Sequence, residues 1–361
     1  MTLSRSYFLT HAPIDFHFSQ NARDFVVEEV PLYDFSGEGE HMVIKVRKKG
    51  LSTWELLDIL SAHTGIKKRD FGYAGLKDKE ALTYQYLSFN KKDREKVESF
   101  SHDQIKIVET TFHNNKIKRG HLKGNRFFIR LKKVLPMHAE KIVQAIKTIE
   151  EQGIPNFFGY QRFGNDGDNH IQGQKILEGS LRIKNINMRS FLLNAYQSHL
   201  FNAWLSKRIE FSHMVKNFTP DEVASQYPGI TPETVQKLQS QPQFFKLLEG
   251  DVISHYPYGR LFFAETLAEE AQRFFEKKTV PTGLLSGKKS KKAEGDAAVF
   301  EAPFDTITKM LDGDRRFAWI FPEEFSYEYK EKEAWFEMKF FLPKGCYATN
   351  VIQEIARGDI R

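Results

Sequence analysis

Four segments of the chain alternate apolar and polar residues, as half-buried β-strands do. They are rich in aromatic and β-branched residues, and they span 24–30, 42–47, 83–89 and 335–342. A polar, glycine-bearing segment at 36–40 separates the first two. The pattern therefore predicts strands near both ends of the chain and a loop between the first pair.

Other segments repeat apolar residues at helical spacing. Ser52 to Glu55 have the spacing of a capping box, which predicts that a helix begins there. The segments 138–152 and 189–209 are further helices, and a last helix over 351–356 follows the C-terminal strand. Because a strand and a helix come after a helix-rich middle, we expect the chain to return to its first domain.

The composition is that of a folded protein with apolar cores. Of the 361 residues, 40% are hydrophobic and 14% are aromatic, and the length suggests about two domains. No apolar run approaches the roughly 18 residues of a membrane span, and the first residues lack the pattern of a secretory leader. Cys346 is the single cysteine, which excludes an intrachain disulfide and a multi-cysteine zinc site. We expect a soluble, cytoplasmic protein without a membrane anchor.

One short segment has the residues of a catalytic site. Asp78 lies between Lys77 and Lys79, directly after a turn that contains Gly72 and Gly75. Glycine permits the backbone angles of a tight turn, and a predicted strand follows. A carboxylate held at a strand edge could act on a bound substrate. The alternative is a solvated, charged turn, which is a common structure.

A second segment favours nucleic acid. Residues 116–133 contain eight lysines and arginines and no acidic residue, interleaved with apolar residues that include Phe127. Basic side chains neutralise phosphates, and an aromatic ring can stack on an unpaired base. The alternative is an amphipathic strand with one basic face. The net charge of +6 agrees with a polyanionic partner.

Two further patterns carry no site. Asp166, Asp168 and His170 lack the later glycine and the terminal glutamate of a calcium loop, so we expect a turn or a helix cap. The segment 283–289 is one residue too short for a nucleotide-binding phosphate loop, and Lys289 stands where serine or threonine is required. We therefore predict no metal and no cofactor.

Six short motifs, in this order, resemble the TruD family of tRNA pseudouridine synthases. They are Asp24 to Glu29, Gly37 to His41, Ala74 to Lys79, Leu122 to Phe127, Asn156 to Gly164 and Leu342 to Thr349. The resemblance extends over nearly the whole chain. Each motif is short, but six in the right order with the right separations make coincidence implausible.

The resemblance implies an α/β fold of the α+β type. A pseudouridine-synthase catalytic domain with a largely antiparallel sheet would be interrupted by an inserted α/β TRUD domain. The motifs assign residues 1–152 and 320–361 to the discontinuous catalytic domain and residues 153–319 to the insertion.

The resemblance also implies a reaction, the isomerisation of uridine in tRNA to pseudouridine, at position 13. The essential aspartate of the family corresponds to Asp78, which attacks C1′ or removes the C2′ proton; the sequence leaves both routes open. Either route needs an ionised carboxylate, and a neighbouring cation favours that form. The target base would be flipped out of its stack.

The resemblance also implies residues that bind the substrate. They are Phe127, which would stack on the base, Asn125, Lys77, Lys79 and Arg162. We expect a monomer that holds tRNA in a basic cleft between the two domains.

This chain departs from the family pattern at Leu76, where a glutamine is frequent, and carries Tyr160 at a variable position.

Two other classes of protein remain as alternatives. A non-catalytic RNA-binding protein would not need the carboxylate of Asp78. A hydrolase acting on nucleosides would need a second carboxylate across the scissile bond, and Glu80 is too close in sequence to be assumed to fill that role.

Overall fold

The computed structural model describes residues 5–77, 79–164, 166–307 and 309–360. By its internal contacts the chain forms two compact units, each of which is built from separate parts of the sequence. Unit 1 consists of Met1–Pro13, Ala145–Phe321 and Cys346–Gly358, and unit 2 consists of Ile14–Gln144, Pro322–Gly345 and Asp359–Arg361. The predicted boundaries of the catalytic domain and its insertion are a division by family motifs, and they stay a prediction.

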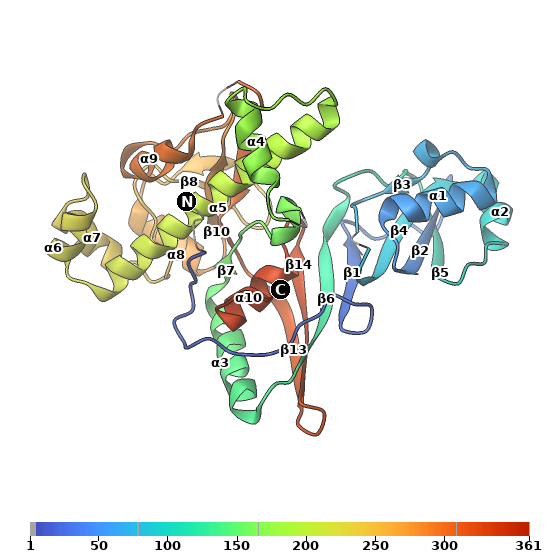
Figure 1. Cartoon of the computed structure of the whole chain (residues 1–361), viewed down its shortest axis with the longest axis horizontal. Coiled ribbons are helices and arrows are strands. Elements are labelled where there is room, and N and C mark those ends of the chain that lie inside the picture. Colours follow the sequence, from blue (N-terminus) through green and yellow to red (C-terminus); the bar gives the residue numbers. More distant parts are fainter. Residues whose placement is uncertain (1–4, 78, 165, 308, 361) are drawn as a thin grey trace. The chain divides into compact units, whose positions relative to one another are not determined.

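Unit 2 is built on one sheet, which has eight strands in the described residues and the order β13-β14-β6-β1-β4-β2-β5, with β3 beside β4 (Figure 1). All neighbours are antiparallel except β1 and β4. The strands are β1 (Phe25–Pro31), β2 (His41–Lys49), β3 (Gly72–Tyr73), β4 (Leu82–Asn90), β5 (Ile105–His113), β6 (Leu122–Lys132), β13 (Glu323–Lys330) and β14 (Trp335–Pro343). The four strands predicted from alternation are β1, β2, β4 and β14.

Helix α1 (Thr53–Thr64) covers one face of this sheet. Its capping box is formed as predicted, because the Ser52 hydroxyl accepts the amide of Glu55 while the Glu55 side chain accepts the amide of Ser52. The apolar face of the helix packs on alternate residues of β2. The shared core contains Met42, Ile44, Val46, Leu56, Leu57 and Leu60. Unit 2 also has the short elements η1 (Lys68–Asp70), η2 (Lys91–Asp93) and α2 (Arg94–Glu98).

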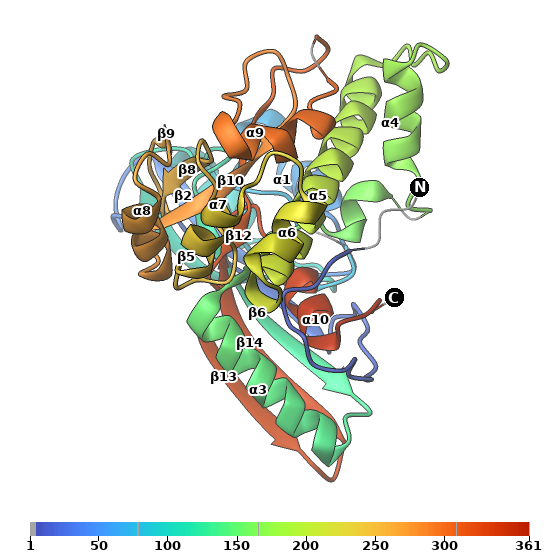
Figure 2. The ribbon, with the colours of Figure 1, turned by 90° about the vertical axis from the view of Figure 1, so that its left-hand side faces the viewer.

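Helix α3 (Pro136–Gln152) leads from unit 2 into unit 1. Unit 1 is organised around the long helix α5 (Ile186–Asn217), beside which α4 (Asn169–Leu177) lies (Figure 2). Its other elements are β7 (Ile154–Pro155), η3 (Tyr160–Phe163), α6 (Pro220–Gln226), α7 (Pro232–Gln239), β8 (Val252–His255), β9 (Leu261–Phe263), α8 (Leu267–Phe275), β10 (Thr279–Leu285), α9 (Gly295–Glu301), η4 (Ala302–Phe304), β11 (Asp314–Phe317), β12 (Trp319–Ile320) and α10 (Ala348–Ala356).

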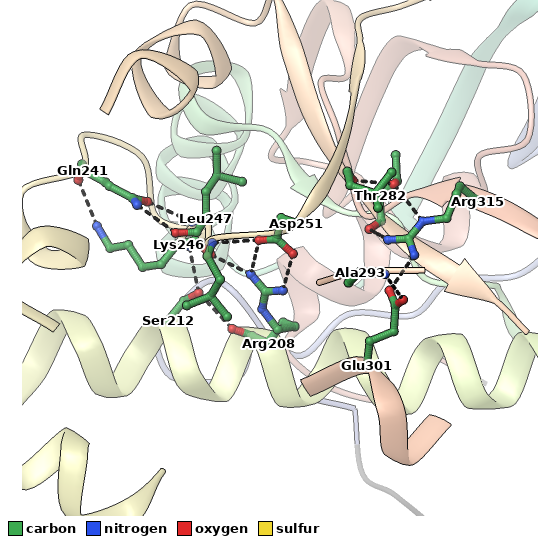
Figure 3. Close-up of polar contacts among 12 residues, drawn as sticks. Arg208, Ser212, Gln241, Lys246, Leu247, Asp251, Thr282, Ala293, Glu301 and Arg315 are labelled. Atoms are coloured by element: carbon green, nitrogen blue, oxygen red, sulfur yellow. Dashed lines mark hydrogen bonds and ion pairs between the residues drawn. The ribbon is translucent and has the colours of Figure 1, made fainter. Parts of the chain in front are cut away.

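Buried ion pairs cross the core of unit 1 (Figure 3). The guanidinium of Arg208 on α5 donates to both carboxylate oxygens of Asp251 at 2.8 Å, and both side chains are buried. Arg315 on β11 pairs at 2.6 Å with Glu301 at the end of α9. Because a buried charge is costly when its partner is missing, these pairs fix how the helices and strands of unit 1 meet.

No helix of the described residues is both long and apolar enough to cross a lipid bilayer.

Candidate active site

Asp78, the predicted catalytic residue, lies outside the described residues. Its neighbours on both sides, Lys77 and Lys79, are described, and their side chains contact the sheet and helix α1.

Lys77 is a buried lysine whose side chain joins the turn to the sheet. Its ammonium donates to Asn125 Oδ1 at 2.7 Å and lies 3.1 Å from Glu29 Oε1. Asn125 on β6 and Glu29 on β1 are directly opposite each other in the antiparallel register. An ammonium group can only donate, so the Asn125 atom that faces it must be the oxygen. The structure therefore brings together two of the predicted substrate-binding residues, Lys77 and Asn125.

Glu29 contacts a predicted site residue, Lys77, and the sequence analysis did not single it out. Its side chain is 1% exposed, and its second oxygen, Oε2, accepts the amide of Tyr86 at 2.8 Å. A buried carboxylate needs such partners, because its desolvation would otherwise be costly. The signal in the sequence was a glutamate at an inward position of a predicted strand.

The first turn of helix α1 holds the backbone of the same turn. The Thr53 hydroxyl accepts the amide of Lys77 at 2.9 Å and donates to Gln85 Oε1 at 3.1 Å. Gln85 in turn donates through Nε2 to the carbonyl of Gly75 at 2.7 Å. Thr53, Gln85 and Lys77 are all buried. Two backbone groups just before residue 78 are therefore fixed by side chains of α1 and β4.

Lys79, on the other side of residue 78, is exposed and contacts the same helix. Its ammonium donates to Glu55 Oε1 at 2.7 Å. This bond to Lys79, together with the amide of Ser52, lowers the pKa of Glu55 to about 2. Both flanks of residue 78 are thus tied to the first turn of α1. Whether either lysine also keeps Asp78 ionised stays a prediction.

Phe127 lies two residues beyond Asn125 on β6, on the same face of the sheet. The ring is 6% exposed. It packs between Phe25, at 6.1 Å between ring centroids, and Phe340, at 5.6 Å. In this arrangement Phe127 belongs to an aromatic row, and stacking on a substrate base would require the ring or a neighbour to move.

Arg162, the remaining predicted residue, is on η3 in unit 1. Its Nε donates to the hydroxyl of Ser198 on α5 at 3.1 Å, and its guanidinium lies 5.7 Å from the ring of Phe158. Beside it, His199 stacks on His170 at 4.3 Å. Burial lowers the pKa of His199 to about 4, with a further contribution from His170.

The basic segment 116–133 divides into two parts. On β6 the arginines and lysines of one face are ion-paired within the sheet. The pairs are Arg126 with Glu324, Arg130 with Glu337, and Lys132 with Asp24. In the preceding loop, Lys118 and Arg119 are exposed. Exposed positive charge that no ion pair in the described residues compensates therefore lies in the loop and at Lys123, near the start of β6.

Comparison with known proteins identifies the chain. The family model "tRNA pseudouridine synthase D (TruD)" matches residues 3–184 and 178–355. A tRNA pseudouridine synthase D of Wolinella succinogenes is 55% identical over 99% of both chains, and one of Nitratiruptor is 54% identical over 99% of both. A crystal structure described as a TruD protein of Methanosarcina mazei has the same fold, with a TM-score of 0.69 over 98% of this chain and 96% of that one, at 18% identity.

These findings define a pseudouridine synthase, a class of isomerase. Within that class, the chain belongs to the tRNA pseudouridine synthase D family, TruD. The predicted family and enzyme class are confirmed, and so is the mixed α/β fold with a largely antiparallel sheet.

Proposed function

We propose that this chain converts uridine 13 of tRNA to pseudouridine and that Asp78 is the catalytic residue. The observation that carries the proposal is the fixed turn. Lys77 joins it to Glu29 and Asn125, and Thr53 holds its backbone. The residue before position 78 is thus held by contacts with α1, β1 and β6, and catalysis depends on such fixed positioning of the reacting groups.

The reaction sets the tasks of the site. The bond between N1 of uracil and C1′ breaks, the base turns, and C5 bonds to C1′. C5 then loses its hydrogen to water as a proton and N1 takes up a proton, so that the product is an isomer of uridine. Asp78 starts this sequence either as a nucleophile at C1′ or as a base at the C2′ proton.

Asn125 is suited to orienting the base. Because its Oδ1 accepts from Lys77, the amide nitrogen Nδ2 remains to donate to a uracil carbonyl. Phe127 and its aromatic neighbours would form an apolar wall that favours the flipped base and excludes water. Arg162 would contact the RNA from unit 1.

We also make proposals about tRNA binding, localisation, oligomeric state, cofactor requirement and domain boundaries. We propose that tRNA is bound in a basic cleft, that the protein acts as a cytoplasmic monomer, and that it needs no cofactor. The domain division at residues 153 and 319 is proposed on the family motifs.

The test is to incubate the protein with unmodified tRNA transcripts and to map pseudouridine by carbodiimide labelling. The proposal expects one modified position, uridine 13, and no labelling in a transcript with cytidine there. If every uridine stays unchanged under conditions in which the protein binds tRNA, the proposed function is wrong.

A further inference from the structure

A partly exposed cation–π cluster lies next to the proposed active-site turn. The guanidinium carbon of Arg119 is 5.9 Å from the ring of Trp54 and 5.4 Å from the ring of Tyr73. Arg119 also donates through Nη2 and Nε to the Tyr73 hydroxyl, at 2.8 and 3.2 Å. Trp54 contacts Tyr73 edge to face at 5.9 Å. We call these three residues the Arg119 platform.

Each residue of the platform adjoins a residue that contacts the turn. Trp54 follows Thr53, which accepts the amide of Lys77. Tyr73 precedes Ala74, whose carbonyl accepts the amide of Gly120, the residue after Arg119, at 2.9 Å. The platform and the turn are therefore held by the same contacts within unit 2.

Two of the three platform residues, Trp54 and Arg119, are exposed, and Tyr73 is half-buried, whereas a purely structural cluster would be covered. Trp54 is 47% exposed, and Leu76 in the turn is 55% exposed. Large apolar side chains that are left accessible beside an active site favour a binding role over a packing role. Tryptophan offers the broadest face for stacking on a base.

The charge around the platform suits RNA. In the described residues the Arg119 guanidinium bonds to the Tyr73 hydroxyl and to no carboxylate, so its positive charge is not compensated by an ion pair. Lys118 and Arg69 are exposed close by in sequence, and Lys116 donates to the carbonyl of Arg69 at 2.7 Å, which joins the two basic segments. On β6, by contrast, Arg126, Arg130 and Lys132 are ion-paired within unit 2.

We propose that the Arg119 platform binds one unpaired nucleotide of the tRNA adjacent to the target uridine. The base stacks on Trp54, and Arg119 binds its phosphate. This inference rests on the proposed function and adds a second nucleotide site to it. When the target base leaves its stack, a neighbouring base loses a stacking partner, and Trp54 replaces that partner.

The experiment measures binding of an unmodified tRNA transcript to the full chain carrying Asp78→Asn, so that chemistry does not intervene. Trp54→Ala is expected to weaken binding roughly 5- to 150-fold, which is about 1–3 kcal/mol at 1.4 kcal/mol per tenfold. Trp54→Phe should keep affinity within about 3-fold. Arg119→Gln should lower the slope of log affinity against log salt by about one.

Trp335→Ala is the matched control, because Trp335 also stacks on an arginine, Arg130, at 4.4 Å, in the same unit. It should leave binding unchanged, and circular dichroism should show all variants folded. The inference is overturned if folded Trp54→Ala binds as tightly as the control, or if Trp54→Phe loses as much as Trp54→Ala. Pseudouridine formation by the wild type is measured separately, so failure of the platform and failure of the proposed function give different results.

Discussion

The Lys77 ammonium lies 3.1 Å from the carboxylate of Glu29, which joins a turn to a strand 48 residues earlier in the chain. Both side chains are buried, and Asn125 completes the contact from β6 at 2.7 Å. A buried ion pair is costly to break from one side only. The pair therefore gives the turn a fixed place on the sheet, at the residue next to Asp78.

Lys77→Met should lower both stability and activity. The substitution leaves the Glu29 carboxylate buried without a cation, which typically costs about 3–5 kcal/mol. Urea denaturation measures that loss, and single-turnover pseudouridine formation measures the rate. The double variant Glu29→Gln, Lys77→Met should recover most of the stability but not the rate. Equal recovery of both quantities would show that Lys77 has no role beyond folding.

Thr53→Val should slow the reaction while leaving tRNA affinity unchanged. Valine has nearly the shape of threonine but cannot accept the amide of Lys77 or donate to Gln85. Lys77, the residue before Asp78, then loses a backbone contact, for which we expect a rate reduction on the order of 10-fold or more. Thr53→Ser keeps the hydroxyl and should stay near the wild-type rate. A slow Thr53→Ser or a fast Thr53→Val would contradict the argument.

Asp251→Ala should strongly destabilise unit 1. It removes the carboxylate that faces the buried Arg208 (Figure 3), and breaking one side of such a pair costs about 3–5 kcal/mol. Glu276→Ala, which breaks an exposed pair with Lys278, is the control and should change the stability little, because solvent screens the two charges. Denaturant midpoints of the two variants compare them directly, and similar midpoints would refute this account of the core.

Acidification should destabilise the protein in part through His199. Burial lowers its pKa to about 4 in the folded state, against the usual 6.5. Between these values the unfolded chain binds a proton that the folded chain does not, so stability falls as pH falls from about 6.5 to about 4. His199→Gln should therefore lose less stability between pH 7 and pH 5 than the wild type. The exposed His63→Gln should behave like the wild type, and equal losses in all three proteins would exclude His199 as a cause.

The local elements of this fold are predictable because their signals are local. Alternation located β1, β2, β4 and β14 to within about two residues, and Ser52 with Glu55 marked the start of α1. The long helix α5 extends eight residues beyond the predicted end at residue 209, to Asn217.

The contacts of the site depend on tertiary pairing, which periodicity does not contain. Glu29 lies opposite Asn125 only because of the register between β1 and β6. The turn before residue 78 then places the Lys77 ammonium in contact with both side chains. In the same way, the buried pair of Arg208 and Asp251 joins residues 43 positions apart, which no local pattern in the sequence indicates. Lys79 bonds to Glu55, a contact that no local pattern in the sequence predicts, and its role as a substrate-binding residue stays a prediction.

The central claim is that the carboxylate at position 78 performs the chemistry, and release of tritium from C5 of uridine in tRNA measures it most directly. The C5 hydrogen leaves only when C5 joins C1′, so binding alone releases none. We predict that the wild type releases tritium from uridine 13, whereas Asp78→Asn binds the same tRNA with similar affinity and releases none above background. Release by Asp78→Asn at the wild-type rate would contradict the account.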